Sequence, residues 1–157
     1  MMPIVNRRKW PIVSLPSPGR FVSGRIPLVC GVDLVDLADF HHDLRLGRDR
    51  FLRRIYTPRE LSYCRGRGDR LAARFAAKEA IAKALGTGIR GLNWREMEVV
   101  PGKHGQPRIV LHGRAQERAK ALRLSGWAVS LSHTHQMAIA CVIALTDGRI
   151  KLNEDDP

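Results

Sequence analysis

The chain has few cysteines, and no two of them are close together. Its three cysteines are Cys30, Cys64 and Cys141. Because the number is odd and no Cys-x-x-Cys motif is present, the sequence disfavours both a disulfide framework and a zinc ribbon. Unpaired thiols are typical of a reducing compartment, so we expect a cytoplasmic protein.

Long apolar runs are missing too. The longest, Met137 to Leu145, has the length of a strand, whereas a helix needs about 20 apolar residues to cross a bilayer. The sequence therefore predicts no membrane-spanning segment. A length of 157 residues with 44% hydrophobic residues instead predicts one domain around one core.

Acidic residues are scarce relative to basic ones, and aromatic residues are few. There are 15 Asp and Glu against 27 Lys and Arg, which gives a formal net charge of +12. Such a surface attracts nucleic acid, anionic lipid, a phosphate-bearing ligand or an acidic protein. The arginine-rich stretch from Arg48 to Arg74 keeps a nucleic-acid-binding module as the rival interpretation. Against it, the aromatic residues are not interleaved with basic ones as a base-stacking surface requires.

The first 25 residues contain no acidic residue at all. We expect residues 1–25 to form a flexible basic extension, with an over-extended start or an organellar transit peptide as alternatives. The domain itself is expected over residues 26–146, followed by a polar tail over 147–157.

The patterning within the domain predicts an α+β fold, with a mixed or antiparallel sheet packed against helices. A capping box at Thr57-Pro58-Arg59-Glu60 opens one of the helices. The last two strands form a hairpin that we expect at the centre of the sheet. Expected strands cover residues 28–34, 96–100, 108–111, 127–132 and 137–145, and expected helices cover 35–46, 48–55, 71–85 and 114–124, with a further one from the capping box.

The helix expected over residues 71–85 has no ordinary solvent face. Large apolar side chains fall on one side of it and alanines cover much of the other. Charged groups in such a place are costly unless they are paired, hydrated or bound to a ligand. A surface pair between Glu79 and Lys83 is the simple explanation, but it presupposes an exposed helix. The charged residues are Arg74, Lys78, Glu79 and Lys83.

Asp33 lies where the first strand gives way to the first helix, and two interpretations are open. Its carboxylate caps that helix, or it converges with Glu79 on a hard cation. Mg²⁺ fits the second interpretation, because it takes one or two protein carboxylates and completes its shell with water and phosphate oxygens. The basic residues of the central helix and the Gly86-Thr87-Gly88 loop would then bind a phosphorylated ligand. Together these residues describe a phosphoryl-transfer site.

The turn His133-Thr134-His135 admits other chemistry. A His-x-His pair binds zinc in some proteins, but no further ligand stands at a suitable spacing. Ser130 and Ser132 precede the turn, yet no Gly-x-Ser-x-Gly motif surrounds them, which disfavours a serine nucleophile. We favour a histidine that touches a phosphate.

Four motifs in this order closely resemble holo-acyl-carrier-protein synthase, of the phosphopantetheinyl transferase superfamily. The resemblance spans about residues 28–145, and its most specific part is Lys-Glu-Ala-x-x-Lys-Ala followed by Gly-Thr-Gly. The motifs are Gly31-Val32-Asp33-Leu34-Val35, Arg74-Phe75-Ala76-Ala77-Lys78-Glu79-Ala80 with Lys83-Ala84-Leu85-Gly86-Thr87-Gly88, Gly105-Gln106-Pro107, and Val129-Ser130-Leu131-Ser132-His133.

The resemblance implies a magnesium-dependent transfer of phosphopantetheine from coenzyme A to a serine of apo acyl carrier protein, with release of adenosine bisphosphate. By this similarity, Asp33 and Glu79 bind Mg²⁺. Glu79, directly or through a water, accepts the serine proton, and Lys83 stabilises or protonates the departing phosphate. The positions along the nucleotide and phosphates are Arg74, Lys83, Gly86, Thr87, Gly88 and His133.

The resemblance further implies a homotrimer with active sites between subunits, and an acidic carrier steered to the basic surface. Many family members have an arginine on the first helix where this chain has Asp39. We hypothesise that Arg45, Arg48 or Arg53 takes over carrier docking. Whether the carrier serves fatty acid or polyketide synthesis stays open, and a non-catalytic relative that binds coenzyme A is the second rival.

Overall fold

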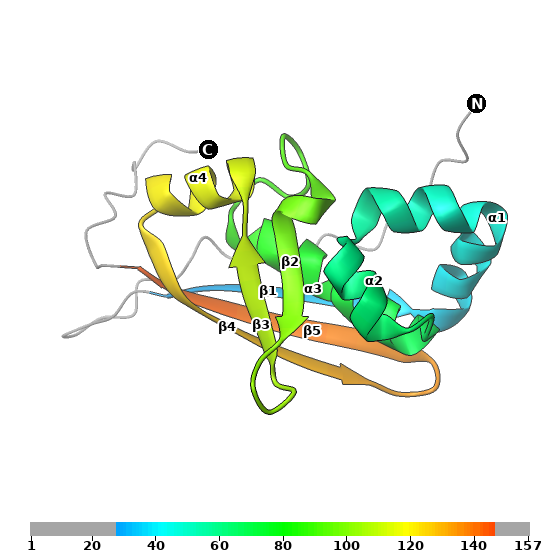
Figure 1. The fold of residues 1–157 in the computed structure, drawn as a ribbon. Helices are drawn as coiled ribbons and strands as arrows, with labels where there is room; N and C mark the ends of the chain where they lie inside the picture. The colour runs from blue at the N-terminus through cyan, green and yellow to red at the C-terminus, as the bar shows by residue number, and fades with distance from the viewer. Residues whose placement is uncertain (1–27, 147–157) are drawn as a thin grey trace.

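The computed structural model describes residues 28–146, apart from the side chain of Arg48. The expected basic extension and polar tail therefore lie outside the described residues. Helices and two antiparallel sheets form one domain (Figure 1), which confirms the predicted α+β class. The elements are β1 (Leu28–Asp36), α1 (Leu37–Ile55), α2 (Pro58–Cys64), α3 (Gly68–Ala84), the 3-10 turn η1 (Trp94–Glu96), β2 (Met97–Pro101), β3 (Pro107–Leu111), α4 (Gly113–Ala121), β4 (Leu124–His133) and β5 (Met137–Thr146).

The larger sheet has three antiparallel strands in the order β1-β5-β4. The prediction of a central hairpin is therefore only half right, because β5 is the central strand and β4 lies at the edge. Asp33 on β1 pairs with Ala140 on β5, in a register that runs unbroken along both strands. Alternate residues of β5, including Ala140 and Val142, are buried, while Ile139 and Ile143 between them are exposed. The sheet thus buries one face and leaves an apolar face uncovered by the described residues.

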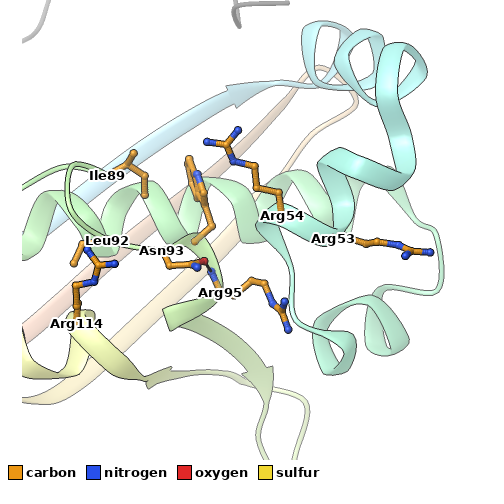
Figure 2. A pocket seen from close by; sticks show the side chains of 8 residues that line it. Arg53, Arg54, Ile89, Leu92, Asn93, Arg95 and Arg114 are labelled. Carbon is orange, nitrogen blue, oxygen red and sulfur yellow. Dashed lines mark hydrogen bonds between the residues drawn. The ribbon is translucent and has the colours of Figure 1, made fainter. Parts of the chain in front are cut away.

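Helix α1 follows β1 directly and changes direction at Gly47, where the backbone leaves helical geometry. The two helices expected on either side of Gly47 are these two halves. Asp36 caps the first half by accepting hydrogen bonds from the amides of Ala38 and Asp39, at 2.8 and 3.1 Å. Asp33 therefore does not cap this helix, and that interpretation is wrong. The end of α1 contacts η1, which in turn contacts α4 (Figure 2).

Helix α2 begins with the predicted capping box. The hydroxyl of Thr57 accepts a hydrogen bond from the Glu60 amide, and the carboxylate of Glu60 accepts one from the Thr57 amide.

None of the described helices combines the length and apolar content of a membrane span.

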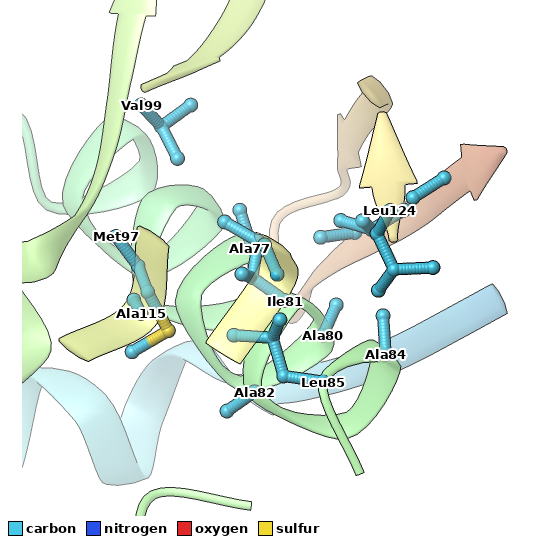
Figure 3. Close-up of a cluster of buried hydrophobic side chains, with 14 of the residues drawn as sticks. Ala77, Ala80, Ile81, Ala82, Ala84, Leu85, Met97, Val99, Ala115 and Leu124 are labelled. Atoms are coloured by element: carbon cyan, nitrogen blue, oxygen red, sulfur yellow. The ribbon is translucent and has the colours of Figure 1, made fainter. Parts of the chain in front are cut away.

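Helix α3 lies on the covered face of the three-stranded sheet. Its alanines allow a close approach, and Figure 3 shows Ala77, Ala80 and Ala84 in the buried cluster that also contains Leu124 at the start of β4. Gly31 of β1 faces this helix, and a side chain there would collide with the carbonyl of Ala80. The glycine and the alanines together hold β1 and α3 at backbone contact.

The smaller sheet is the hairpin of β2 and β3, which are antiparallel. Strand β2 contacts α3, and β3 contacts β4. The hairpin therefore covers the side of α3 that the larger sheet leaves open, which explains why α3 is buried nearly all round.

Candidate active site

Lys83, near the end of α3, is held against β1. Its Nζ donates to the Oδ1 of Asp33 at 2.7 Å and to the carbonyl oxygen of Val32 at 2.9 Å. An ammonium group has three donors, and the Lys83 side chain remains 44% exposed. One donor is therefore directed away from these two contacts and is available to an incoming ligand.

Asp33 is a largely buried carboxylate, and its contacts with Lys83 offset only part of the cost of burying its charge. Burial raises its pKa more than the hydrogen bond and the charge of Lys83 lower it. The charged form is thus less stable here than in water. A cation other than Lys83 would offset this penalty.

Glu79 stands one helical turn before Lys83, so the two side chains share a face of α3. Helix α3 runs antiparallel to β1: Gly31 faces Ala80, whereas Leu37, just past the end of β1, packs with Leu71 near the start of the helix. Asp33 lies between Gly31 and Leu37 on the chain and contacts Lys83, which is one helical turn after Glu79. The convergence of the Asp33 and Glu79 carboxylates on a metal stays a prediction.

The Gly86-Thr87-Gly88 loop follows immediately after α3. Gly86 and Gly88 have φ values of 76° and 54°, and glycine adopts this left-handed region without strain. The Thr87 hydroxyl donates to the carbonyl oxygen of Gly88 at 2.9 Å. The loop thus lies at the same end of α3 as Lys83.

Lys78 does not take part in this site. Its Nζ contacts the Oε2 of Glu60 at 2.9 Å and the carbonyl oxygens of Trp94 and Met97 at 3.0 and 2.7 Å. These partners occupy all three donors, and burial lowers the pKa of the ammonium group. The expectation that Lys78 donates to a ligand is wrong, because its side chain is fully buried.

Arg74 is buried between α3 and the smaller sheet. Its guanidinium donates to the carbonyl oxygens of Val99 and Arg70, both at 3.2 Å, and lies 4.5 Å from the ring centroid of Tyr63. Within one chain the guanidinium of Arg74 is used to link α3 to β2. Its contact with a nucleotide stays a prediction.

His133 lies at the other end of α3. Its Nε2 is 3.0 Å from the Oδ2 of Asp69. The hydrogen bond from Arg67 lowers the pKa of Asp69 to about 2. Lys83 comes fourteen positions after Asp69, which is about 21 Å along a helix. A single chain therefore does not bring His133 to the Lys83 end of the helix.

Two features of this region were missed from the sequence. The first is the ion pair of Glu60 with Lys78. From the sequence, Glu60 was interpreted only as a capping residue, although a lysine on so crowded a helix indicates an acidic partner elsewhere in the chain. The second feature is a pocket between α1, η1 and α4, whose arginines come from separate segments.

Comparison with known proteins assigns the chain to a family. Residues 29–141 match the model of the 4'-phosphopantetheinyl transferase superfamily. The chain belongs to this superfamily. It groups with the holo-acyl-carrier-protein synthases, so the predicted family and its transferase class are confirmed.

Two curated relatives of this transferase carry the name holo-acyl-carrier-protein synthase. The one from Herpetosiphon aurantiacus is 44% identical over 125 residues, which are 75% of this chain and 98% of the relative. The one from Chloroflexus aurantiacus is 45% identical over 130 residues, covering 73% and 95%.

Solved structures of this transferase family share the fold. Holo-acyl-carrier-protein synthase from Helicobacter pylori, in complex with coenzyme A, aligns with a TM-score of 0.68 at 28% identity, covering 73% of this chain and 98% of that one. The synthase from Neisseria meningitidis aligns with a TM-score of 0.67 at 34% identity, covering 74% and 96%.

Proposed function

We propose that this enzyme transfers the 4'-phosphopantetheine group of coenzyme A to a serine of apo acyl carrier protein, with release of adenosine 3',5'-bisphosphate. The observation that carries the proposal is the contact of Lys83 with Asp33, at the end of α3 that leads into the Gly86-Thr87-Gly88 loop. The names of the relatives support the same reaction. We place this reaction in the cytoplasm, since the three cysteines are free thiols.

The proposed metal is Mg²⁺, with Asp33 and Glu79 as its ligands. The described residues contain no cluster of three or more metal-binding side chains. Two carboxylates suffice for Mg²⁺ when substrate phosphates and water complete the shell. The raised pKa of Asp33 fits this assignment, because a nearby divalent cation favours the charged carboxylate. When bound, the ion neutralises charge on the diphosphate of coenzyme A.

The chain's own residues then position the reaction. Glu79 accepts the proton of the carrier serine, whose oxygen forms a bond to the phosphorus that bears pantetheine. The bond from that phosphorus to the oxygen of the adenosine-side phosphate breaks, and the bisphosphate leaves. Lys83, fixed by Asp33 and the Val32 carbonyl, donates its remaining N–H to the departing phosphate.

The assembly that we propose is a homotrimer with active sites between subunits. The uncovered face of the three-stranded sheet supports it. Leu34 on β1 is 52% exposed, and an apolar surface of this kind is typical of an interface. Its exposed large side chains are Leu28, Val32, Leu34, Ile139, Ile143 and Leu145.

The separation of His133 from Lys83 supports the same assembly. His133 reaches a nucleotide at Lys83 only if it belongs to a neighbouring subunit. Arg74 is likewise proposed to contact the nucleotide in the complete site.

The test is incubation of the protein with coenzyme A, Mg²⁺ and apo carrier protein, with mass spectrometry of the carrier. We expect the mass to rise by one phosphopantetheine group. Asp33→Ala and Glu79→Ala should abolish the increase, while circular dichroism shows a folded domain. Exposed Glu117 on α4 offers a control, Glu117→Ala, which should keep the activity. Binding of coenzyme A without product on several carriers would favour the non-catalytic rival, and salt-sensitive DNA binding without product would favour the nucleic-acid rival.

A further inference from the structure

A pocket of about 430 Å³ lies between the end of α1, η1 and the first turn of α4. Its apolar part is formed by Ile89, Leu92 and Trp94, all of them half-buried. Four exposed arginines complete the lining together with Asn93. They are Arg53 and Arg54 of α1, Arg95 of η1 and Arg114 of α4. Figure 2 shows Arg54, Arg95 and Arg114 on three different elements, with the side chains of Arg53 and Arg95 extending outward.

The positive charge in this pocket is poorly compensated within the described chain. Arg114 donates to the carbonyl oxygen of Gly91 at 3.1 Å. No ion pair or hydrogen bond of the Arg53, Arg54 or Arg95 side chain occurs among the described residues. Four like charges around one hollow repel one another, and guanidinium groups bind carboxylates or phosphates in two-pronged fashion. The pocket is thus complementary to an anion.

The kink at Gly47 gives this pocket its position. The first half of α1 contains Asp39 and Asp43 but only one arginine, whereas most of its arginines follow the kink. The second half ends with Arg53 and Arg54 beside η1.

The pocket also adjoins the candidate active site. The ring of Trp94 stacks on Phe75 of α3 with 4.9 Å between centroids. Phe75 precedes Glu79 by one helical turn and lies on the same face. Trp94 of the pocket thus contacts α3 about two helical turns before Lys83.

We infer that this pocket docks the acidic protein substrate, by taking its carboxylates on Arg54, Arg95 and Arg114 and an apolar side chain on the floor formed by Ile89, Leu92 and Trp94. Arginine and tryptophan are enriched among the residues that dominate protein interfaces. The open, mostly charged lining suits one or two side chains of a protein surface. This inference rests on the proposed function, and it extends docking from α1 to η1 and α4.

The test is Arg54→Glu/Arg95→Glu in the full chain, with steady-state kinetics against apo carrier and against coenzyme A. We expect the KM for carrier to rise about tenfold or more, with little change in the KM for coenzyme A or in kcat at saturating carrier. Raising the salt concentration should increase the wild-type KM for carrier toward that of the variant. The matched control is Lys103→Glu/Arg108→Glu, which makes the same charge change on exposed residues of the β2–β3 hairpin. It should leave the KM for carrier within about twofold.

The outcomes separate this inference from the proposed function. Wild-type protein that modifies no carrier contradicts the proposed function itself. Wild-type protein that modifies carrier, with an unchanged KM for carrier in Arg54→Glu/Arg95→Glu, overturns only the docking surface. A rise in the KM for coenzyme A alone also overturns it, since the pocket then receives the nucleotide substrate.

Discussion

Lys78 and Glu60 form an ion pair inside the protein, with 2.9 Å between Nζ and Oε2 and no exposure of either side chain. Glu60 also accepts hydrogen bonds from the amides of Thr57 and Val99, at 2.8 and 2.9 Å. The pair therefore ties α2, α3 and β2 together. Lys83, five residues later on the same helix, is partly exposed and faces the candidate site. One helix thus places one lysine in the interior and another at the candidate active site.

Lys78→Met should destabilise the fold strongly. Removing the ammonium leaves Glu60 charged and buried, which typically costs about 3–5 kcal/mol in the free energy of unfolding. Lys83→Met, which breaks a partly exposed pair, should cost less than about 1 kcal/mol. Urea denaturation of both variants measures the difference. Equal stability of the two variants would contradict the structural role of Lys78, and Glu60→Gln/Lys78→Met should recover part of the loss.

Asp33→Asn should raise the melting temperature at neutral pH while it abolishes transfer. The pKa of Asp33 is raised in the folded protein. The folded state therefore holds this proton more tightly than the unfolded state, and stability falls as the pH rises from the unfolded pKa of about 3.9 through the folded pKa. Asparagine removes that penalty because it is never charged.

Calorimetry as a function of pH checks this sign. The variant should be the more stable protein above the folded pKa of Asp33, and its advantage should vanish below the unfolded pKa, where the wild-type carboxyl is neutral too. A variant less stable than wild type at neutral pH would show that the contact with Lys83 outweighs burial.

How far the sequence predicts the fold and the candidate site depends on how far apart in the sequence the interacting residues lie. The capping box, the turn after α3 and the crowding of α3 by alanines are local patterns, so they were predicted correctly. Asp33 was ambiguous, because a carboxylate at a strand end suits both a cap and a metal. The added length of β1, which makes Asp36 the cap, excludes the first interpretation, and the metal stays a prediction.

The partners of Arg74, Lys78 and His133 were not predictable by local rules. Each depends on the packing of elements distant in sequence: Arg74 on β2, Lys78 on the start of α2, and His133 on the start of α3. The arginine pocket could not be predicted from the sequence for the same reason. Its residues come from elements between α1 and α4, and only the kink at Gly47 and the position of η1 bring those elements to one pocket.

Val32→Glu should dissociate the proposed trimer. Val32 lies on the exposed apolar face of β1, 42% exposed in the single chain, and a buried carboxylate without a partner would oppose association. Light scattering should show trimers for wild type and monomers for the variant, with loss of transfer. Gln116→Glu, on the exposed side of α4, adds the same charge elsewhere and should leave the mass unchanged. Trimers of Val32→Glu would contradict this face as the interface.

Subunits that lack Lys83 and subunits that lack His133 should restore activity to each other. If the active site combines Lys83 of one subunit with His133 of its neighbour, Lys83→Ala and His133→Ala are each inactive or weak alone. In trimers assembled at random from equal amounts of both, a site is intact when a His133→Ala subunit supplies Lys83 and its neighbour supplies His133. That combination occurs at about one quarter of the sites. Co-expression of the two variants, followed by the carrier mass assay, should therefore give about a quarter of the wild-type rate. Activity no higher than that of the separate variants would show that both residues act within one chain or that His133 has no part in the site.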